Sequence, residues 1–267
     1  MNPTSLLAAG GSRWRRYLSF AAIVLLFLLW DFIAEPAIVV ALRPSTELEA
    51  MLIVRGMLAL LLALGFTIRG TWGANGFRGG LQLRWWRALW PVWLWAVPML
   101  ALYAGQRPVK EHLQTLAFCM LIGFVEEAIF RGIMLRNLLP GGTRSAILWS
   151  AVWFGALHLT GALAGFDTRM VLLTVASAFA VGVVFAWVRL ASASIWPVVI
   201  AHGFYDYAAL IESGGLREAM RYSTNEAVLS ALFTVLLLTW AGRLMFHDAW
   251  SSQRAARALD DLTSKPA

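Results

Sequence analysis

The sequence has little charge and almost no cysteine. Only 14% of its 267 residues are charged, whereas 60% are hydrophobic. Soluble domains carry about 25% charged residues, so this chain has too few charges to solvate the surface of a soluble protein. Its high apolar content also excludes an intrinsically disordered chain. Cys119 is the only cysteine, which excludes an intramolecular disulfide and a cysteine-based metal site.

Long apolar runs are the main feature of the chain, and its mean hydropathy is +0.67. A membrane-spanning helix needs about 20 mostly apolar residues. The sequence therefore predicts an all-α polytopic membrane protein with about eight transmembrane helices in one bundle, residues 17–246. Segment 1–16 precedes this bundle and tail 247–267 follows it. The expected spans are 17–42, 50–68, 85–103, 112–134, 145–165, 169–190, 194–211 and 225–246.

The basic residues are distributed unevenly between the connections. With the N-terminus inside, fourteen Lys and Arg fall on the cytoplasmic side, seven fall on the opposite side, and Arg131 lies within a span. This asymmetry predicts that both termini are cytoplasmic. It also explains the pI of about 10.3 without a nucleic-acid partner. Short loops, the arginine-rich composition and the absence of an organellar targeting signal favour a bacterial inner membrane.

Ionisable residues inside spans are functional candidates, because a charge at the bilayer centre costs about 3 kcal/mol. The string FVEEAIFRG lies in the fourth expected span, WFGALH in the fifth and AHGFYD in the seventh. The sequence has no HExxH, GxSG or GxGD motif, so it lacks the signatures of three other intramembrane protease classes. The candidate residues are Glu126, Glu127, Arg131, His158, His202 and Asp206.

Helical spacing sorts these residues into groups. Glu127 and Arg131 are four residues apart and share a face, while Glu126 points about 100° away. We therefore expect Glu127 and Arg131 to neutralise each other and Glu126 to be left over. His202 and Asp206 are also four apart, so they face the same volume.

Depth in the membrane is a second criterion. At about 1.5 Å per residue, Glu126, His158 and His202 lie roughly 14, 20 and 12 Å from the cytoplasmic ends of their spans. These similar depths predict one polar chamber that opens to the cytosol.

Two histidines with carboxylates are the side chains of a hydrolytic site. In one scheme Glu126, His158 and His202 bind a metal ion such as Zn²⁺, which activates a water. In the other scheme the site is metal-free: Glu126 and His158 take the proton of the water, while His202 and Asp206 polarise the scissile carbonyl. The residues alone leave both schemes open.

The three motifs EExxxR, FxxxH and HxxxD occur in order over residues 110–211. In this the chain resembles the CAAX protease and bacteriocin-processing family of intramembrane endopeptidases, also called CPBP or Abi, which includes the type II CAAX prenyl endopeptidases. The resemblance implies an eight-helix core, a cytosol-facing chamber and Glu126 as the catalytic carboxylate. It also implies that His158, His202 and Asp206 complete the site, whether the enzyme is a metalloprotease or of glutamate type.

Asp206 departs from the eukaryotic members of the family, which have Asn at the last motif position. An amide donates a hydrogen bond without protonation and a carboxylate does not, so Asp206 favours a metal-binding or orienting role. Two structural interpretations stay open: a buried ion pair for Glu127 and Arg131, and packing for Phe154.

The leading hypothesis is an intramembrane endopeptidase that cleaves a membrane-anchored peptide or protein in the lipid bilayer. The alternative is a non-enzymatic bacteriocin immunity or peptide-binding membrane protein. A proton- or cation-coupled transporter is a third possibility, although the sequence has no evident inverted repeat.

Overall fold

The computed structural model describes residues 21–81, 83–103, 105, 108–213 and 224–246, and these residues form helices without any β-strand. This confirms the all-α prediction. The chain divides into two compact units, Met1–Val54 and Arg55–Ala267. The predicted segment 1–16 and tail 247–267 lie outside the described residues.

The described part of the first unit is helical. Ala21–Leu42 forms one helical stretch of 22 residues, which includes the π-turn η1 (Trp30–Ala34) and ends with α2 (Glu35–Leu42). Pro36 lies two residues after the end of η1, and its missing N–H explains why the regular hydrogen-bond ladder is interrupted there. The unit ends within α3 (Glu47–Ile68).

The second unit contains the remaining described helices. Some are short 3₁₀ or π segments that extend a longer helix. In order they are η2 (Leu83–Leu89), α4 (Trp90–Tyr103), α5 (Val109–Glu127), η4 (Ala128–Met134), α6 (Leu135–Leu138), η5 (Leu139–Gly141), α7 (Thr143–Leu157), α8 (Thr160–Leu163), α9 (Thr168–Ser192), α10 (Trp196–Ser213) and α11 (Thr224–Phe246).

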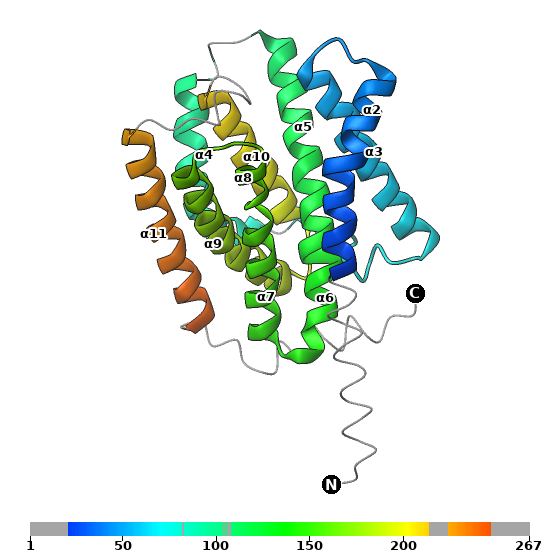
Figure 1. Ribbon diagram of the computed structural model, residues 1–267. Helices are drawn as coiled ribbons and strands as arrows, with labels where there is room; N and C mark the ends of the chain where they lie inside the picture. The colour runs from blue at the N-terminus through cyan, green and yellow to red at the C-terminus, as the bar shows by residue number, and fades with distance from the viewer. Residues whose placement is uncertain (1–20, 82, 104, 106–107, 214–223, 247–267) are drawn as a thin grey trace. The chain divides into compact units, whose positions relative to one another are not determined.

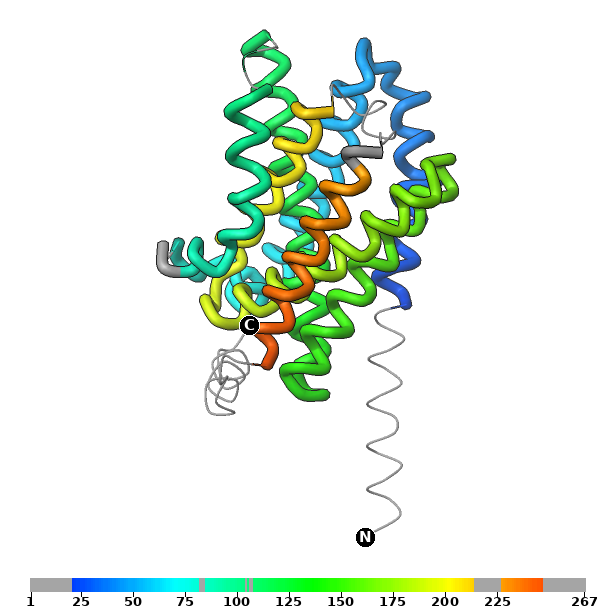
Figure 2. The backbone as a smooth tube through the Cα atoms, turned by 90° about the vertical axis from the view of Figure 1, so that its left-hand side faces the viewer, coloured from blue at the N-terminus to red at the C-terminus, as the bar shows by residue number. Residues whose placement is uncertain are grey.

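The long helices of the second unit lie side by side and alternate in direction (Figures 1 and 2). Helix α9 packs between α7 and α11, and α10 packs between α5 and α4. Of the helices apolar enough to span a membrane, α9 is the most enclosed, with 61% of its apolar window buried. It therefore forms the centre of this unit.

The helices support an integral membrane protein with the predicted number of eight helices. Among the described residues, five helices are long and apolar enough to cross a membrane: Ala21–Leu42, Glu47–Ile68, Thr143–Leu163, Thr168–Ser192 and Ala227–Phe246. Helices α4, α5 and α10 occupy the other three expected spans without meeting that criterion. Two of them, α5 and α10, carry most of the candidate ionisable residues, which lower their hydropathy.

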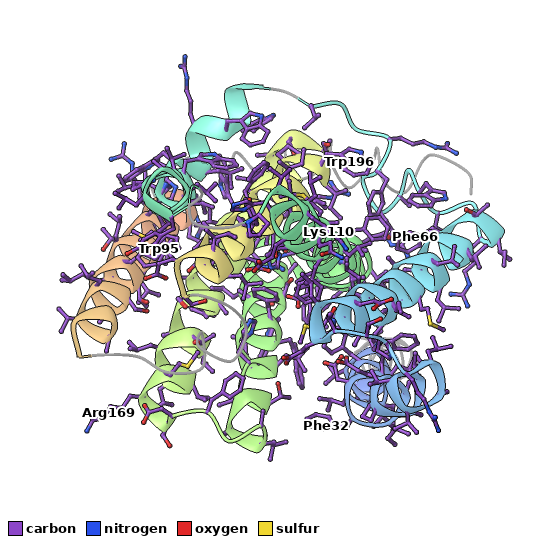
Figure 3. All side chains as sticks on the ribbon, turned by 90° about the horizontal axis from the view of Figure 1, so that it is seen from above. Phe32, Phe66, Trp95, Lys110, Arg169 and Trp196 are labelled. Carbon is purple, nitrogen blue, oxygen red and sulfur yellow. The ribbon has the colours of Figure 1, made fainter. Side chains whose placement is uncertain are left out.

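The glycine-rich connection after α3, residues 69–81, is partly buried in the second unit. The ring of Phe77 contacts the rings of Phe66 and Trp196, two residues labelled in Figure 3. The indole N–H of Trp196 donates to the Phe77 carbonyl at 2.9 Å, and the Ile195 N–H donates to the Gly76 carbonyl at 3.1 Å. These bonds attach the connection to the start of α10.

Candidate active site

The candidate site is built where α5 and α10 cross closely. A Cβ atom on Gly123 of α5 would lie 2.7 Å from the Val199 carbonyl oxygen, and one on Gly203 of α10 would lie 2.7 Å from the Met120 sulfur. Glycine at both positions therefore allows the two backbones to approach. This crossing brings Glu126 and Glu127, one turn after Gly123, next to His202.

Glu127 is the centre of a buried hydrogen-bonded chain. Its Oε1 accepts from Nη1 of Arg131 at 2.9 Å and contacts Nδ1 of His202 at 2.8 Å. The side chains of Glu127 and Arg131 are 0% exposed. Because a carboxylate only accepts hydrogen bonds, Nδ1 of His202 carries the proton. Glu127 thereby fixes both the orientation and the tautomer of His202.

The other nitrogen of His202 faces two partly exposed carboxylates. Its Nε2 lies 3.4 Å from Oδ2 of Asp206 and 3.8 Å from Oε2 of Glu126. The Glu126 and Asp206 side chains are 22% and 26% exposed, so they can be reached from outside the packed core. Glu126 therefore lies at the edge of a polar space, whereas Glu127 lies inside the protein.

His158 is held through the same ring nitrogen as His202. It follows the last residue of α7, and its Nδ1 lies 2.9 Å from the Phe154 carbonyl oxygen, which can only accept. Nδ1 therefore carries the proton, and the lone pair of Nε2 is left to accept another. The sequence predicts His158 inside a span over 145–165, and His158 lies within the apolar helical stretch Thr143–Leu163. Helix α7 itself ends at Leu157, and the chain continues through α8.

Phe154 connects the separate parts of the site. Its ring centroid lies 4.1 Å from the guanidinium carbon of Arg131, 5.1 Å from the His158 ring and 5.8 Å from the His202 ring. The contact with Arg131 has the geometry of a cation–π interaction. Phe154 is therefore a packing residue, which is one of the interpretations left open by the sequence. The residues that its ring packs against are three of the candidate polar residues.

The helix that carries the two glutamates widens immediately after them. Ala128–Met134 forms the π-turn η4, where the sequence predicts regular α-helix over 112–134. The hydroxyl of buried Ser150 on α7 donates to the Phe130 carbonyl at 3.1 Å. A π-turn inside an α-helix is common at functional sites because it redirects side chains.

The predicted site residues therefore gather in one place. Arg131, Glu127 and His202 form a continuous chain, Glu126 and Asp206 face Nε2 of His202, and Phe154 links His158 to this set. The sequence predicts the Glu127–Arg131 pair but not the bond from Glu127 to His202. No sequence signal identifies that bond, because it joins residues 75 positions apart.

The metal scheme has a specific geometric requirement. A Zn²⁺ site needs three or four side-chain ligands directed at one point. In the part of the chain that the structure describes, no group of three or more His, Cys, Asp or Glu side chains is placed to hold a metal ion. The metal scheme with Glu126, His158 and His202 stays a prediction.

A comparison with protein families gives a match over the candidate site. Residues 108–208, which hold the whole candidate site, match the family described as type II CAAX prenyl endopeptidase Rce1-like. Searches of curated proteins and of solved structures gave no match. The matched segment agrees with the motif region 110–211 predicted from the sequence. Over this segment, the chain is similar to the Rce1-like type II CAAX prenyl endopeptidase family.

Proposed function

We propose that this integral membrane protein is an intramembrane endopeptidase that hydrolyses a peptide bond of a membrane-anchored peptide or protein. The observation that carries the proposal is that the two histidines are held through the same ring nitrogen. Each imidazole uses Nδ1 to bind an acceptor on the protein. Each therefore keeps Nε2 for a water or a substrate.

Glu126 and His158 are the groups that activate the water. The Glu126 carboxylate is partly exposed and makes no short hydrogen bond to Arg131, unlike its neighbour Glu127. Nε2 of His158 has a free lone pair. A water between these two groups loses a proton as its oxygen attacks the carbonyl carbon of the substrate.

His202 and Asp206 act on the other side of the reacting bond. With both nitrogens protonated, His202 donates from Nε2 to the oxyanion that forms, while its Nδ1–H stays bound to Glu127. Asp206, at 3.4 Å from Nε2, orients the imidazole and favours the proton there. This assigns an orienting role to the aspartate that stands where the eukaryotic members of the family have asparagine.

Product formation needs a proton on the leaving nitrogen. The proton taken from the water by Glu126 or His158 is returned to that nitrogen when the tetrahedral intermediate collapses. Glu127 and Arg131 stay charged and paired throughout, so they position His202 without exchanging protons. Zn²⁺ held by Glu126, His158 and His202 remains the alternative chemistry, in which the metal would activate the water.

The location of the reaction follows from the charge asymmetry. We propose a bacterial inner membrane, cytoplasmic termini and a chamber that opens to the cytosol, because fourteen basic residues lie on that side against seven on the other. The substrate is then cut near the cytoplasmic leaflet.

The test is cleavage of a membrane-peptide library by the purified full-length protein in detergent. We expect Glu126→Gln to lower the cleavage rate by about 10²–10⁴-fold, the range of general acid–base catalysis. Glu111→Gln, which changes a carboxylate at the opposite end of the same helix, is the matched control. Full activity of Glu126→Gln would refute the proposal.

A chelator arm distinguishes the two chemistries. Loss of activity with chelator and its recovery with Zn²⁺ would establish the metal scheme, and unchanged activity supports the glutamate scheme. Tight peptide binding without cleavage by the wild-type protein would instead favour the immunity or peptide-binding alternative.

A further inference from the structure

A second buried arginine lies outside the candidate active site. Arg189, in the last turn of α9, is 3% exposed. Its Nε has no hydrogen-bond partner, and the side chain makes no ion pair with any of the described residues. Arg131 is equally buried but is neutralised by Glu127 at 2.9 Å. A buried guanidinium without a counter-ion is unfavourable, so Arg189 requires an explanation that Arg131 does not.

The guanidinium of Arg189 lies against the backbone of the glycine-rich connection. Gly76 has a φ of +90°, and a Cβ atom there would lie 2.4 Å from Cζ and Nε of Arg189. Only glycine allows the guanidinium to lie directly against this backbone. The preceding residue, Asn75, is 1% exposed, and neither its amide nitrogen nor its amide oxygen has a hydrogen-bond partner among the described residues.

A second arginine adds to the positive charge. Asn75 packs on Gly132, whose Cβ position lies 3.3 Å from the Asn75 Cβ. Arg136 follows Gly132 by four residues, about one helical turn, and is half-buried. Its charge repels that of Arg189. The described residues give Arg136 no ion pair either.

We infer that Arg189, Arg136 and Asn75 form a binding site for a phosphate group. Guanidinium groups donate in a planar fork that matches phosphate oxygens, and the Asn75 amide supplies a further donor. The repulsion between the two arginines and the unpartnered donors are then both relieved by one bound anion. Phosphate supplies enough acceptor oxygens for all three side chains, and its negative charge neutralises both guanidinium groups.

The place of the site in the fold indicates two sources of this phosphate. The end of α9, the segment around Arg136 and the glycine-rich connection all lie at the predicted cytoplasmic ends of their spans. Anionic lipid headgroups are concentrated at that surface, and basic pockets between helices there bind them. A soluble phosphate in the cytosol has the same recognised chemistry and could reach the same side.

The test uses the delipidated full-length protein in neutral detergent, with thermal unfolding followed by the fluorescence of its 14 tryptophans. The added ligands are phosphatidylglycerol, phosphatidylcholine and inorganic phosphate. We expect phosphatidylglycerol to raise the unfolding temperature saturably and phosphatidylcholine to leave it unchanged. An equal rise with inorganic phosphate would identify the soluble anion as a sufficient ligand.

Variants of the three residues test whether the rise in unfolding temperature comes from binding at the proposed phosphate site. Arg136→Gln should weaken the apparent affinity about tenfold, the effect of losing one charge-assisted hydrogen bond. Arg189→Gln should abolish the response and raise the unfolding temperature of the delipidated protein, because it removes an unpaired buried charge. Asn75→Ala tests the site without altering charge and should also weaken the response.

Arg144→Gln is the matched control, because Arg144 is exposed and begins α7 at the same end of the bundle. It should respond as the wild type does. The inference is overturned if no anion raises the unfolding temperature, or if Arg136→Gln and Arg144→Gln respond alike. Because the readout is ligand binding, this outcome is independent of whether the protein cleaves peptides.

Discussion

Glu126 and Glu127 are adjacent in the chain but meet different surroundings. Glu127 is fully buried against Arg131 and His202, whereas 22% of the Glu126 side chain is exposed. We expect Glu127→Gln to destabilise the protein by about 3–5 kcal/mol, because it leaves the Arg131 charge buried and unpaired. Glu126→Gln should change stability little. Thermal unfolding of both variants in the same detergent measures this difference, and equal losses would contradict it.

Phe154 provides a second prediction at the scale of single residues. Its ring contacts Arg131, His158 and His202. Phe154→Leu should lower kcat by about tenfold or more with little change in KM, because the histidines lose the surface that fixes their rings. Phe233→Leu is the control for loss of a buried ring, because the Phe233 ring on α11 contacts Trp95 and Tyr205 and none of the candidate site residues. Equal activity of the two variants would show that Phe154 only fills space.

The local part of this site could be predicted from spacing. Four residues separate Glu127 from Arg131, and the pair forms at 2.9 Å. The bond from Glu127 to His202 could not be predicted in this way, because it depends on how two helices cross. Helical periodicity specifies which residues share a face, but not which face of a distant helix lies opposite.

At the scale of helices, the crossing of α5 and α10 determines the site. Gly203→Ala should separate the helices, because its Cβ atom would lie 2.7 Å from the Met120 sulfur and 3.1 Å from the Met120 Cα. We expect a loss of about 1–3 kcal/mol in stability, the usual cost of overpacking, together with loss of activity.

Gly242→Ala is the control for that prediction, because Gly242 also lies within a helix but nothing is within 4 Å of its Cβ position. It should be neutral or slightly stabilising, since alanine favours helix more than glycine does. Measuring unfolding temperature and cleavage rate for both variants separates close packing from helix propensity. A neutral Gly203→Ala variant would show that the crossing tolerates more space than its geometry indicates.

Two structural features at the scale of helices and connections could not be predicted from the sequence. The π-turn η4 interrupts a segment whose apolar pattern is that of a regular helix. Its extra residue per turn has no local signature, because it is stabilised by partners such as Ser150 on another helix. The connection around Gly76 has the composition of an exposed loop, yet Asn75 and Phe77 are buried. Packing with α9 and α10, and not composition, decides its position.

For the whole molecule, hydropathy predicted the number and order of the helices well. The eight apolar segments all correspond to helices because lipid requires every backbone group in a span to be paired internally. Hydropathy was least informative for α5 and α10, where ionisable residues offset the apolar ones. The helices that carry most of the candidate site residues are thus the ones that least resemble ordinary membrane spans.

The orientation in the membrane gives the last prediction. Arg144 begins α7, and Arg169 lies at the start of α9, where its side chain points away from the bundle in Figure 3. Because α7 and α9 pack together in opposite directions, these residues lie at opposite ends of the pair. The charge asymmetry predicts that position 144 is cytoplasmic and position 169 is outside.

Single cysteines at these two positions measure that orientation directly. Cys119 is the only native cysteine and is buried, so Cys119→Ser gives a background free of thiols. In intact cells a membrane-impermeant maleimide should label Arg169→Cys and leave Arg144→Cys unlabelled. Inverted vesicles should give the reverse pattern. Labelling of Arg144→Cys in intact cells would show the inverted membrane orientation, in which the chamber opens away from the cytosol. Cleavage would then have to occur at the outer leaflet, so this measurement decides which leaflet presents the substrate.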